Sequence, residues 1–338
     1  MNAPNFEMTD TNKNRFNDFF TIYSLQNVID TNVTSRIYLG NAESKRCRFC
    51  NKTSHETSFI TEAHVIPRGI GNRYLLSHFE CDQCNKVFSQ TYDDSFASYM
   101  SAIRPFANVK NRNKKGNKNV KHKEEKSGLE IVHGENSVEV TFSATHPEVL
   151  DLNREEKRLT IKATLPPYIP IFVYKEFLKI AMSMIDESEL ACFKRAFYML
   201  QNNNQDYKLK GGDFYKICIH SIPGIPLYNK PVAILYNRRP EFSDANQIEK
   251  VLVMHFANKI FVMYLPFNDA DLHIEGQTIK PLIYPVIMPK SYFDEYGLFT
   301  SKWVNLSSNE RTVGEQVTHS MTFEEGLFDI SQDTASKI

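Results

Sequence analysis

The most informative segment of this chain opens with Cys47-Arg48-Phe49-Cys50 and closes with Cys81-Asp82-Gln83-Cys84-Asn85. Between them lie Thr61-Glu62-Ala63-His64-Val65-Ile66-Pro67 and Gly71-Asn72, so two Cys-x-x-Cys pairs bracket a histidine placed close to an acid. A tetrahedral zinc ion accepts four thiolates, and each such turn brings two sulfur atoms to one side. The alternative, four reduced cysteines without a metal, is disfavoured by the presence of two pairs. The pattern predicts a structural zinc site with the ligands Cys47, Cys50, Cys81 and Cys84.

Length and composition indicate a globular chain without a strong overall charge. The 338 residues are 41% hydrophobic, which is enough for two domains with their own cores. Forty basic residues balance forty acidic ones, so a nucleic-acid partner would have to be recognised by local clusters of charge. Residues 110–126 form such a cluster, with eight lysine or arginine residues against two glutamates.

The N-terminal residues predict a cytoplasmic protein. Residues 1–17 are polar and lack the basic and then apolar pattern of a secretory signal. No apolar stretch approaches the roughly 20 residues that span a bilayer, so we expect no membrane association. In the cytoplasm, paired cysteines hold metal far more often than they form disulfides.

The segment between the cysteine pairs predicts two short strands joined by a loop. Residues 58–66 are rich in β-branched and aromatic residues, and Pro67 ends this strand. Side chains two apart in a strand share a face, so Glu62 and His64 would point the same way. Residues 74–79 predict the second strand.

A helix is expected directly after the second cysteine pair. Apolar residues recur there at intervals of three and four, which is one face of a helix, and Pro105 is expected to end it. Asn85 would lie at the helix start. The face consists of Phe88, Tyr92, Phe96, Tyr99 and Ile103.

This combination resembles the HNH endonucleases, whose core is the ββα-metal fold, and in particular the branch with paired zinc knuckles. The motifs that carry it are the two Cys-x-x-Cys knuckles, Glu-Ala-His-x-Ile-Pro, Gly-Asn and the Asn after the last cysteine. The resemblance covers about residues 45–105. It implies that His64 is the general base, that Asn85 binds a catalytic divalent metal and that Asn72 braces the loop.

One position departs from the family pattern. Many members carry an Asp, Glu or His directly before the base, where it binds the metal, and this chain has Ala63. Glu62, one residue earlier, is the candidate substitute. Asp93 lies two turns beyond Asn85 on the expected helix and is a further candidate ligand, as is Asp94.

The expected chemistry is hydrolysis of a phosphodiester bond. A neutral imidazole can take a proton from water at cellular pH, and Mg²⁺ or Mn²⁺ held by few oxygen ligands keeps positions open for phosphate oxygens. DNA is the expected substrate, and RNA is not excluded by backbone chemistry. The basic segment at residues 110–126 is expected either to contact the phosphate backbone or to form a solvated linker. The candidates for DNA contact are Arg68, Arg73, Lys114 and Lys115.

The predicted fold class is α+β, with a zinc-stapled ββα-metal nuclease domain followed by a mixed α+β domain with an antiparallel sheet and a helical pair. The second domain is expected to contain a hairpin at 129–142, a strand at 159–165, helices at 173–185 and 188–201, and a hairpin at 251–265. The expected divisions are a leader with helical structure (1–46), the nuclease domain (47–106), a basic linker (107–128), the second domain (129–306) and a polar tail (307–338).

Three functions follow as hypotheses. The first is a metal-dependent DNA endonuclease, for which the resemblance also implies a role in bacterial restriction or anti-phage defence. The second is a zinc-stabilised nucleic-acid-binding protein that does not cleave, which Ala63 favours. The third is a sensor whose C-terminal domain controls the nuclease through a regulatory protein or ligand, and a homodimer is a further hypothesis.

Overall fold

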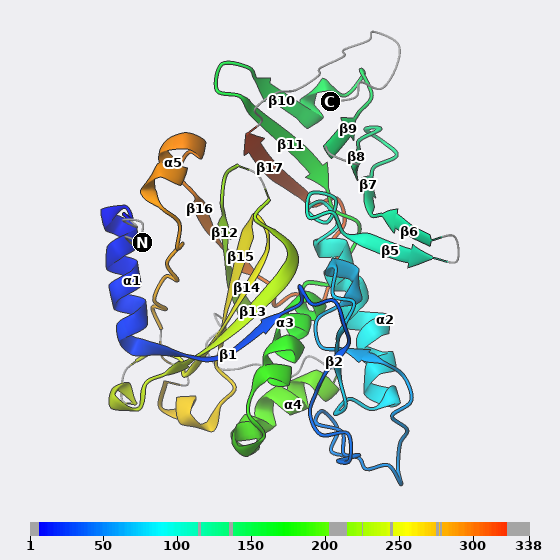
Figure 1. Ribbon diagram of the computed structural model, residues 1–338, viewed down its shortest axis with the longest axis vertical. Helices are drawn as coiled ribbons and strands as arrows, with labels where there is room; N and C mark the ends of the chain where they lie inside the picture. Colours follow the sequence, from blue (N-terminus) through cyan, green and yellow to red (C-terminus); the bar gives the residue numbers. More distant parts are fainter. Residues whose placement is uncertain are drawn as a thin grey trace.

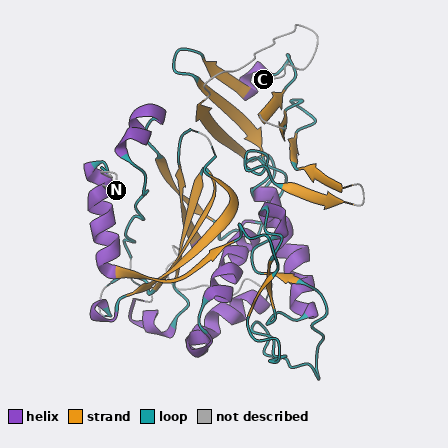
Figure 2. Ribbon diagram, viewed as in Figure 1, coloured by secondary structure: helices purple, strands orange, loops and turns teal. Residues whose placement is uncertain are grey.

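The computed structural model describes residues 7–113, 116–134, 138–202, 215–224, 226–243, 246–274, 277 and 279–322. These residues form a mixed α+β structure in which a twisted sheet faces a group of helices (Figures 1 and 2). The sheet has six antiparallel strands in the order β1, β13, β14, β15, β12 and β16. Their bounds are Tyr23–Asp30, Tyr228–Arg238, Lys250–Ala257, Lys259–Leu265, Lys216–Ser221 and Thr300–Asn305.

The predicted hairpin at 251–265 is confirmed as strands β14 and β15. Phe256 pairs with Lys259, so two residues make the turn, and Ala257 adopts a left-handed φ of 53° there. Every residue of β14 is buried, with Leu252, Met254 and Phe256 in one hydrophobic cluster and Val251 and Val253 in another. Apolar side chains on both faces are typical of a central strand covered on two sides.

Helix α3 (Pro170–Met184) lies between this sheet and helix α2 (Asp82–Tyr99), as Figure 1 shows. The Phe177 ring of α3 contacts Phe96 of α2 at a centroid distance of 5.1 Å and Phe261 of β15 at 5.5 Å. A continuous hydrophobic core therefore joins the cysteine-rich segment to the large sheet. The helix is almost entirely buried, including its three charged residues Lys175, Glu176 and Lys179.

The expected leader and helical pair are partly as predicted. Residues Asp10–Ile22 form α1 and lead directly into β1, so the N-terminal segment packs as part of the large sheet. The second helix of the pair was expected from residue 188, but η3 (Glu187–Phe193) is a 3-10 helix and only Lys194–Gln201 is α-helical, as α4. Residues 1–6 lie outside the described part of the chain.

The segment expected to be a basic linker contains strands. Residues Lys110–Asn113 (β5) pair with Gly116–Asn119 (β6), and Lys121–Lys123 (β7) pairs with Glu130–His133 (β8). The hairpin predicted at 129–142 is present as β8 and Val138–Thr141 (β9). An Asn- and Lys-rich composition indicated a solvated linker, but backbone hydrogen bonds of a hairpin do not require apolar side chains.

A separate sheet of three strands includes part of the expected tail. Gln316–Thr322 (β17) pairs antiparallel with Arg158–Thr164 (β11), which in turn pairs with Leu150–Asn153 (β10). Residues Gln316–Thr322 of the expected polar tail thus belong to this sheet, and residues 323–338 lie outside the described chain. The short helix α5 spans Lys290–Tyr296. No helix in the described chain has the length and apolar character needed to cross a lipid bilayer.

Two buried histidines on the large sheet predict a loss of stability in acid. Burial lowers the pKa of both His220 and His255 from 6.5 to about 4. The unfolded chain then binds more protons than the folded chain between these pH values, so stability falls as pH drops from 6.5 towards 4. The full lowering of the pKa corresponds to a loss of about 3 kcal/mol in the free energy of unfolding for each histidine.

This expectation is checked by denaturant unfolding at pH 7, 6 and 5 for the unaltered protein and for His255→Gln. The variant should show a shallower loss of stability with acid. An identical pH dependence in the two proteins would show that His255 does not titrate in this way.

Candidate metal centre and active site

The four predicted zinc ligands come together in one cluster. The ligand atoms of Cys47, Cys50, Cys81 and Cys84 all lie within 4.8 Å of one another. The Sγ atoms of Cys47 and Cys84 are 3.8 Å apart, and those of Cys50 and Cys81 are 3.7 Å apart. A tetrahedron with zinc–sulfur bonds of about 2.3 Å has sulfur–sulfur edges of about 3.8 Å. The donor set and its spacing therefore fit a zinc ion with four thiolate ligands.

Helix α2 begins inside the second knuckle. Cys81 is its N-cap and Asp82 its first residue, so the helix starts three residues before the predicted Asn85, which lies within its first turn. The Asp82 carboxylate accepts hydrogen bonds from the backbone N–H groups of Ile60 (3.0 Å) and Thr61 (2.8 Å). This carboxylate ties the loop before His64 to the helix, and an acid in the first turn also suits the helix dipole.

Asn72 braces the loop between the strands through its side-chain amide. Its Nδ2 donates to the carbonyl oxygens of Ile66 (2.7 Å) and Leu75 (2.9 Å), and its Oδ1 accepts from the N–H groups of Leu75 (2.9 Å) and Tyr74 (3.3 Å). The side chain is fully buried. Both ends of the amide are thus used to hold the loop closed.

Replacing Asn72 by alanine should destabilise the protein by on the order of 2–4 kcal/mol, because buried backbone groups lose their partners. Urea unfolding of Asn72→Ala measures this change. The matched control is Asn229→Ala, since Asn229 is exposed, and it should leave stability within about 0.5 kcal/mol. Equal stability of the two variants would contradict the bracing role.

His64 lies on a much shorter strand than expected. Strand β3 contains only Ala63–His64 and pairs antiparallel with β4 (Leu75–Ser77), which pairs in parallel with β2 (Ile37–Leu39). The predicted strand 58–66 is therefore confirmed for two residues, because a loop tied to Asp82 occupies the residues before it. Strands β3 and β4 then precede α2 in the chain.

Several charged groups influence the half-buried imidazole of His64. Burial lowers its pKa, and the positive charges of Arg68 and Lys179 lower it further, while Asp93 and Glu62 oppose them. The uncharged imidazole is favoured by this balance.

Glu62 does not lie beside the histidine in the strand. Its carboxylate forms an ion pair with the Arg36 guanidinium at 2.7 Å, and both side chains are largely exposed. Among the described residues, the four cysteines are the one group of three or more His, Cys, Asp or Glu side chains with ligand atoms this close together. Glu62, His64 and Asp93 are therefore not brought into a comparable cluster.

A buried charged cluster next to His64 was not predicted from the sequence. The Lys179 ammonium of α3 is 3.4 Å from the Glu176 carboxylate and 3.7 Å from that of Asp93, and it donates to the His64 carbonyl oxygen at 3.3 Å. Glu80 is also buried near it, and neither of its carboxylate oxygens has a hydrogen-bond partner. The signal in the sequence was three charged residues, Lys175, Glu176 and Lys179, inside an otherwise largely apolar helix.

The protonation of this cluster follows from its burial. Burial raises the pKa of Glu80 to about 7 and that of Glu176 well above its usual value. Burial alone would lower the pKa of Lys179, but the carboxyl groups of Glu176, Asp93 and Glu80 together raise it. Lys179 is therefore a charged ammonium that links the strand of His64 to α3.

The first zinc knuckle also contacts α3 directly. Arg48, between the two cysteines, donates through Nη1 to the carbonyl oxygens of Met182 (3.1 Å), Ser183 (3.1 Å) and Ile185 (3.0 Å) at the end of the helix. Its guanidinium carbon lies 4.1 Å from the centroid of the Phe79 ring. A cation at a helix C-terminus satisfies the free carbonyl groups and suits the dipole.

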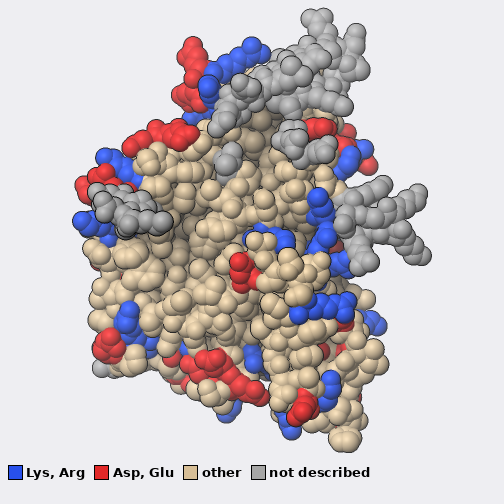
Figure 3. Space-filling view, in the orientation of Figure 1, with Lys and Arg blue, Asp and Glu red and all other residues tan. Residues whose placement is uncertain are grey.

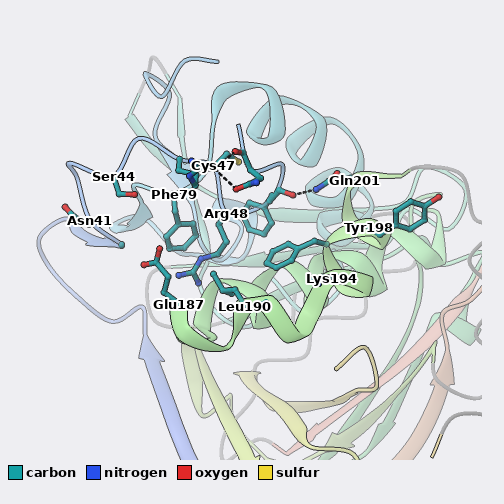
Figure 4. Close-up of a pocket in the computed structure, with 16 residues that line it drawn as sticks. Asn41, Ser44, Cys47, Arg48, Phe79, Glu187, Leu190, Lys194, Tyr198 and Gln201 are labelled. Atoms are coloured by element: carbon teal, nitrogen blue, oxygen red, sulfur yellow. Dashed lines mark hydrogen bonds between the residues drawn. The ribbon is translucent and has the colours of Figure 1, made fainter. Parts of the chain in front are cut away.

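A cavity of about 650 Å³ lies beside this contact, between the knuckle and the residues of η3 and α4. Figure 4 shows the Arg48 side chain next to Phe79 and Glu187 at the cavity. Gln201, which also lines the cavity, donates a hydrogen bond to the Phe49 carbonyl oxygen. His64 and Asn85 do not line it. The cavity is thus separate from the candidate active site.

The predicted DNA contacts are only partly described. Arg68 is exposed in the short 3-10 helix η1 (Arg68–Ile70), and Arg73 donates to the Lys110 carbonyl oxygen at 3.2 Å. Lys114 and Lys115 lie outside the described residues. Over the described part of the face in Figure 3, acidic and basic side chains are interspersed around the edge and most of the centre carries neither.

Comparison with known protein families identifies the cysteine-rich segment. Residues 47–100 match the family model of the HNH endonucleases, a range that runs from the first zinc ligand through α2. It includes His64, Asn72 and Asn85. This part of the chain is therefore similar to the HNH endonucleases, a family of nucleases. No curated protein and no solved structure was found to match the chain.

Proposed function

We propose that this protein is a metal-dependent endonuclease that hydrolyses DNA phosphodiester bonds, with His64 as the general base. The observation that carries the proposal is the HNH family match over residues 47–100, within which His64 lies on β3 and four cysteines form a zinc-like cluster. We assign β3, β4 and α2 to the ββα-metal core of that family.

Each element of the site has a structural task in this proposal. The zinc ion bound by four thiolates has no open position, so its role is to hold the two knuckles together. Asn72 keeps the loop between β3 and β4 closed, and Lys179 holds the backbone of His64. The imidazole is thereby positioned to accept a proton from the attacking water.

The catalytic divalent ion, Mg²⁺ or Mn²⁺, would neutralise charge on the phosphate and the departing oxygen. Asp93 offers a carboxylate, although its Oδ1 lies 3.7 Å from the Lys179 ammonium, and Asn85 offers an amide oxygen. Glu62 would have to leave Arg36 before it could serve as a ligand. We therefore place the ion at Asn85, with Asp93 and Glu62 as alternative further ligands, because Asn85 and Asp93 lie about 12 Å apart along the same helix.

The DNA backbone would be held by Arg68 and Arg73 beside the site and by the basic segment that includes Lys114 and Lys115. Several hypotheses stay predictions from the sequence. They are RNA as the substrate, a cytoplasmic location, a role in restriction or anti-phage defence, a homodimer and a regulatory partner for the C-terminal domain. The division of the chain at residues 46, 106, 128 and 306 also stays a prediction.

The test is cleavage of supercoiled plasmid by the full, zinc-loaded chain with Mg²⁺ or Mn²⁺ added. Nicked or linear product that needs the added ion is the expected result. A double-stranded RNA of similar length in the same assay distinguishes the two nucleic acids. No product from either substrate, with the protein folded and containing zinc, would count against the nuclease.

The second candidate is a nucleic-acid-binding protein that does not cleave. Two observations favour it: Ala63 stands where many HNH members have a metal-binding residue, and Glu62 is already paired with Arg36. Such a protein would retard the plasmid in a gel-shift assay and leave it intact in Mn²⁺. Cleavage and retention therefore separate the two functions in the same experiment.

A further inference from the structure

Two adjoining cavities lie between the edge of the six-stranded sheet and the β11–β17 sheet. Their volumes are about 320 Å³ and 470 Å³, and both are lined by Ser221, Lys259, Thr300 and Thr318. Together they have the size of a site for a small organic ligand. We name the two cavities together the β12–β17 cleft. Of residues 47–100, which match the HNH family, only those at the end of α2 line the cleft.

Strand pairing places the polar residues of the cleft in rows. Ser221 of β12 pairs with Lys259 of β15 on one side and Thr300 of β16 on the other, so three polar side chains stand in line across three strands. Lys302 is two residues beyond Thr300 and points to the same face. Thr318 of β17 lines the cleft from the opposite sheet.

The charge of the cleft is positive and has no acidic counterpart in its lining. No Asp or Glu lines either cavity. Lys259 is half-buried and donates to the Ser221 hydroxyl at 2.7 Å, and the ion pairs found among the described residues include neither Lys259 nor Lys302. Burial, and to a smaller extent the positive charge of nearby Lys302, lower the pKa of Lys259 to about 8. An uncompensated pair of lysines at a concave surface attracts anions.

A buried histidine in the cleft also lacks a partner. His319 of β17 is 6% exposed, lines the smaller cavity, and its Nε2 has no hydrogen-bond partner. This Nε2 atom is therefore available to form a hydrogen bond with a ligand that enters the cavity. At the outer end, Arg158 lines the larger cavity and is paired with Glu156 at 2.6 Å.

The two ends of the cleft differ in chemistry. One end carries hydrogen-bond donors that suit phosphate oxygens. These are the ammonium groups of Lys259 and Lys302 and the hydroxyl groups of Ser221, Thr300 and Thr318. The smaller cavity continues over apolar and aromatic side chains, where a flat ring could pack. These are Tyr99, Met100, Ile103, Ile219 and Phe261.

We propose that the β12–β17 cleft binds a nucleotide, with its phosphates at Lys259 and Lys302 and its base against the end of α2. The volume exceeds that of a single phosphate ion, and the apolar end distinguishes a nucleotide from an inorganic anion. Tyr99 is the last residue of the same helix that begins at the second zinc knuckle. The ligand would therefore contact the nuclease helix at the end remote from the metal centre.

The test is isothermal titration calorimetry of the full, zinc-loaded chain with ATP, ADP and inorganic phosphate, without added divalent ion. ATP or ADP should bind more tightly than phosphate, and Lys259→Met and Lys302→Met should each weaken nucleotide binding at least about tenfold. Lys123→Met is the matched control, because Lys123 is an exposed strand residue outside both cavities. Lys302 is also exposed, so its variant should fold even if Lys259→Met does not.

Other outcomes would overturn the proposal. They are the absence of nucleotide binding at millimolar concentration, binding that both lysine variants leave unchanged, and phosphate binding as tight as that of ATP. Loss of DNA retention in the two variants without any nucleotide binding would assign the cleft to nucleic acid instead. Binding is measured without cleavage, so failure here leaves the proposed nuclease function untouched.

Discussion

Changing His64 to alanine is expected to reduce metal-dependent plasmid cleavage by about 10²–10⁴-fold, which is the usual contribution of a general base. His64 is half-buried on β3, and its backbone is held by β4 and by Lys179. The substitution removes the imidazole and leaves those backbone hydrogen bonds in place. The loss should therefore appear in the rate of cleavage and not in the fold.

The measurement is the initial rate of plasmid nicking at saturating Mn²⁺, with zinc content and circular dichroism recorded for every protein. His55→Ala is the matched control, because His55 also lies between the knuckles and is exposed. It should cleave at the unaltered rate. Equal rates for His64→Ala and the unaltered protein would remove His64 from the mechanism, even if cleavage itself were real.

The second large effect is expected from the zinc cluster. Replacing Cys81 by serine should abolish tight zinc binding and lower stability by on the order of 5 kcal/mol, or roughly 10 °C or more in melting temperature. Cys81 is a buried member of the cluster and also the N-cap of α2. Losing the metal would release the first knuckle, the start of the helix, and the contact of Arg48 with α3.

Metal analysis and thermal unfolding measure this effect. The matched control is Cys192→Ser, since Cys192 is a free and exposed cysteine outside the cluster. Its zinc content and melting temperature should equal those of the unaltered protein. A Cys81→Ser variant that kept both would show that the four thiolates do not form a zinc site that supports the fold.

Some elements could be predicted from local sequence alone. The hairpin of β14 and β15 was predicted because two short apolar runs flank a turn of two residues. The zinc cluster was predicted because Cys-x-x-Cys spacing determines the direction of both sulfur atoms within one turn. Asn72 was assigned a bracing role from the family pattern, and its four hydrogen bonds agree with that role.

Other elements depended on partners distant in the chain. Strand β17 exists because Arg158–Thr164 offers it an edge some 150 residues away, and nothing in its polar composition indicated this. Asp82 at the start of α2 holds the loop at Ile60 and Thr61, about twenty residues earlier in the chain. The strand around His64 was shortened by the same loop.

The sequence by itself determined the candidate site: four cysteines with metal-binding spacing, a histidine on a strand and an asparagine near the start of a helix. Only the tertiary structure placed Glu62 on Arg36, brought Lys179 of α3 to His64 and formed the β12–β17 cleft. Motifs are encoded by spacing along the backbone, which local geometry converts directly into position. The neighbours of a charged side chain depend instead on how helices and sheets pack, and no local spacing specifies that.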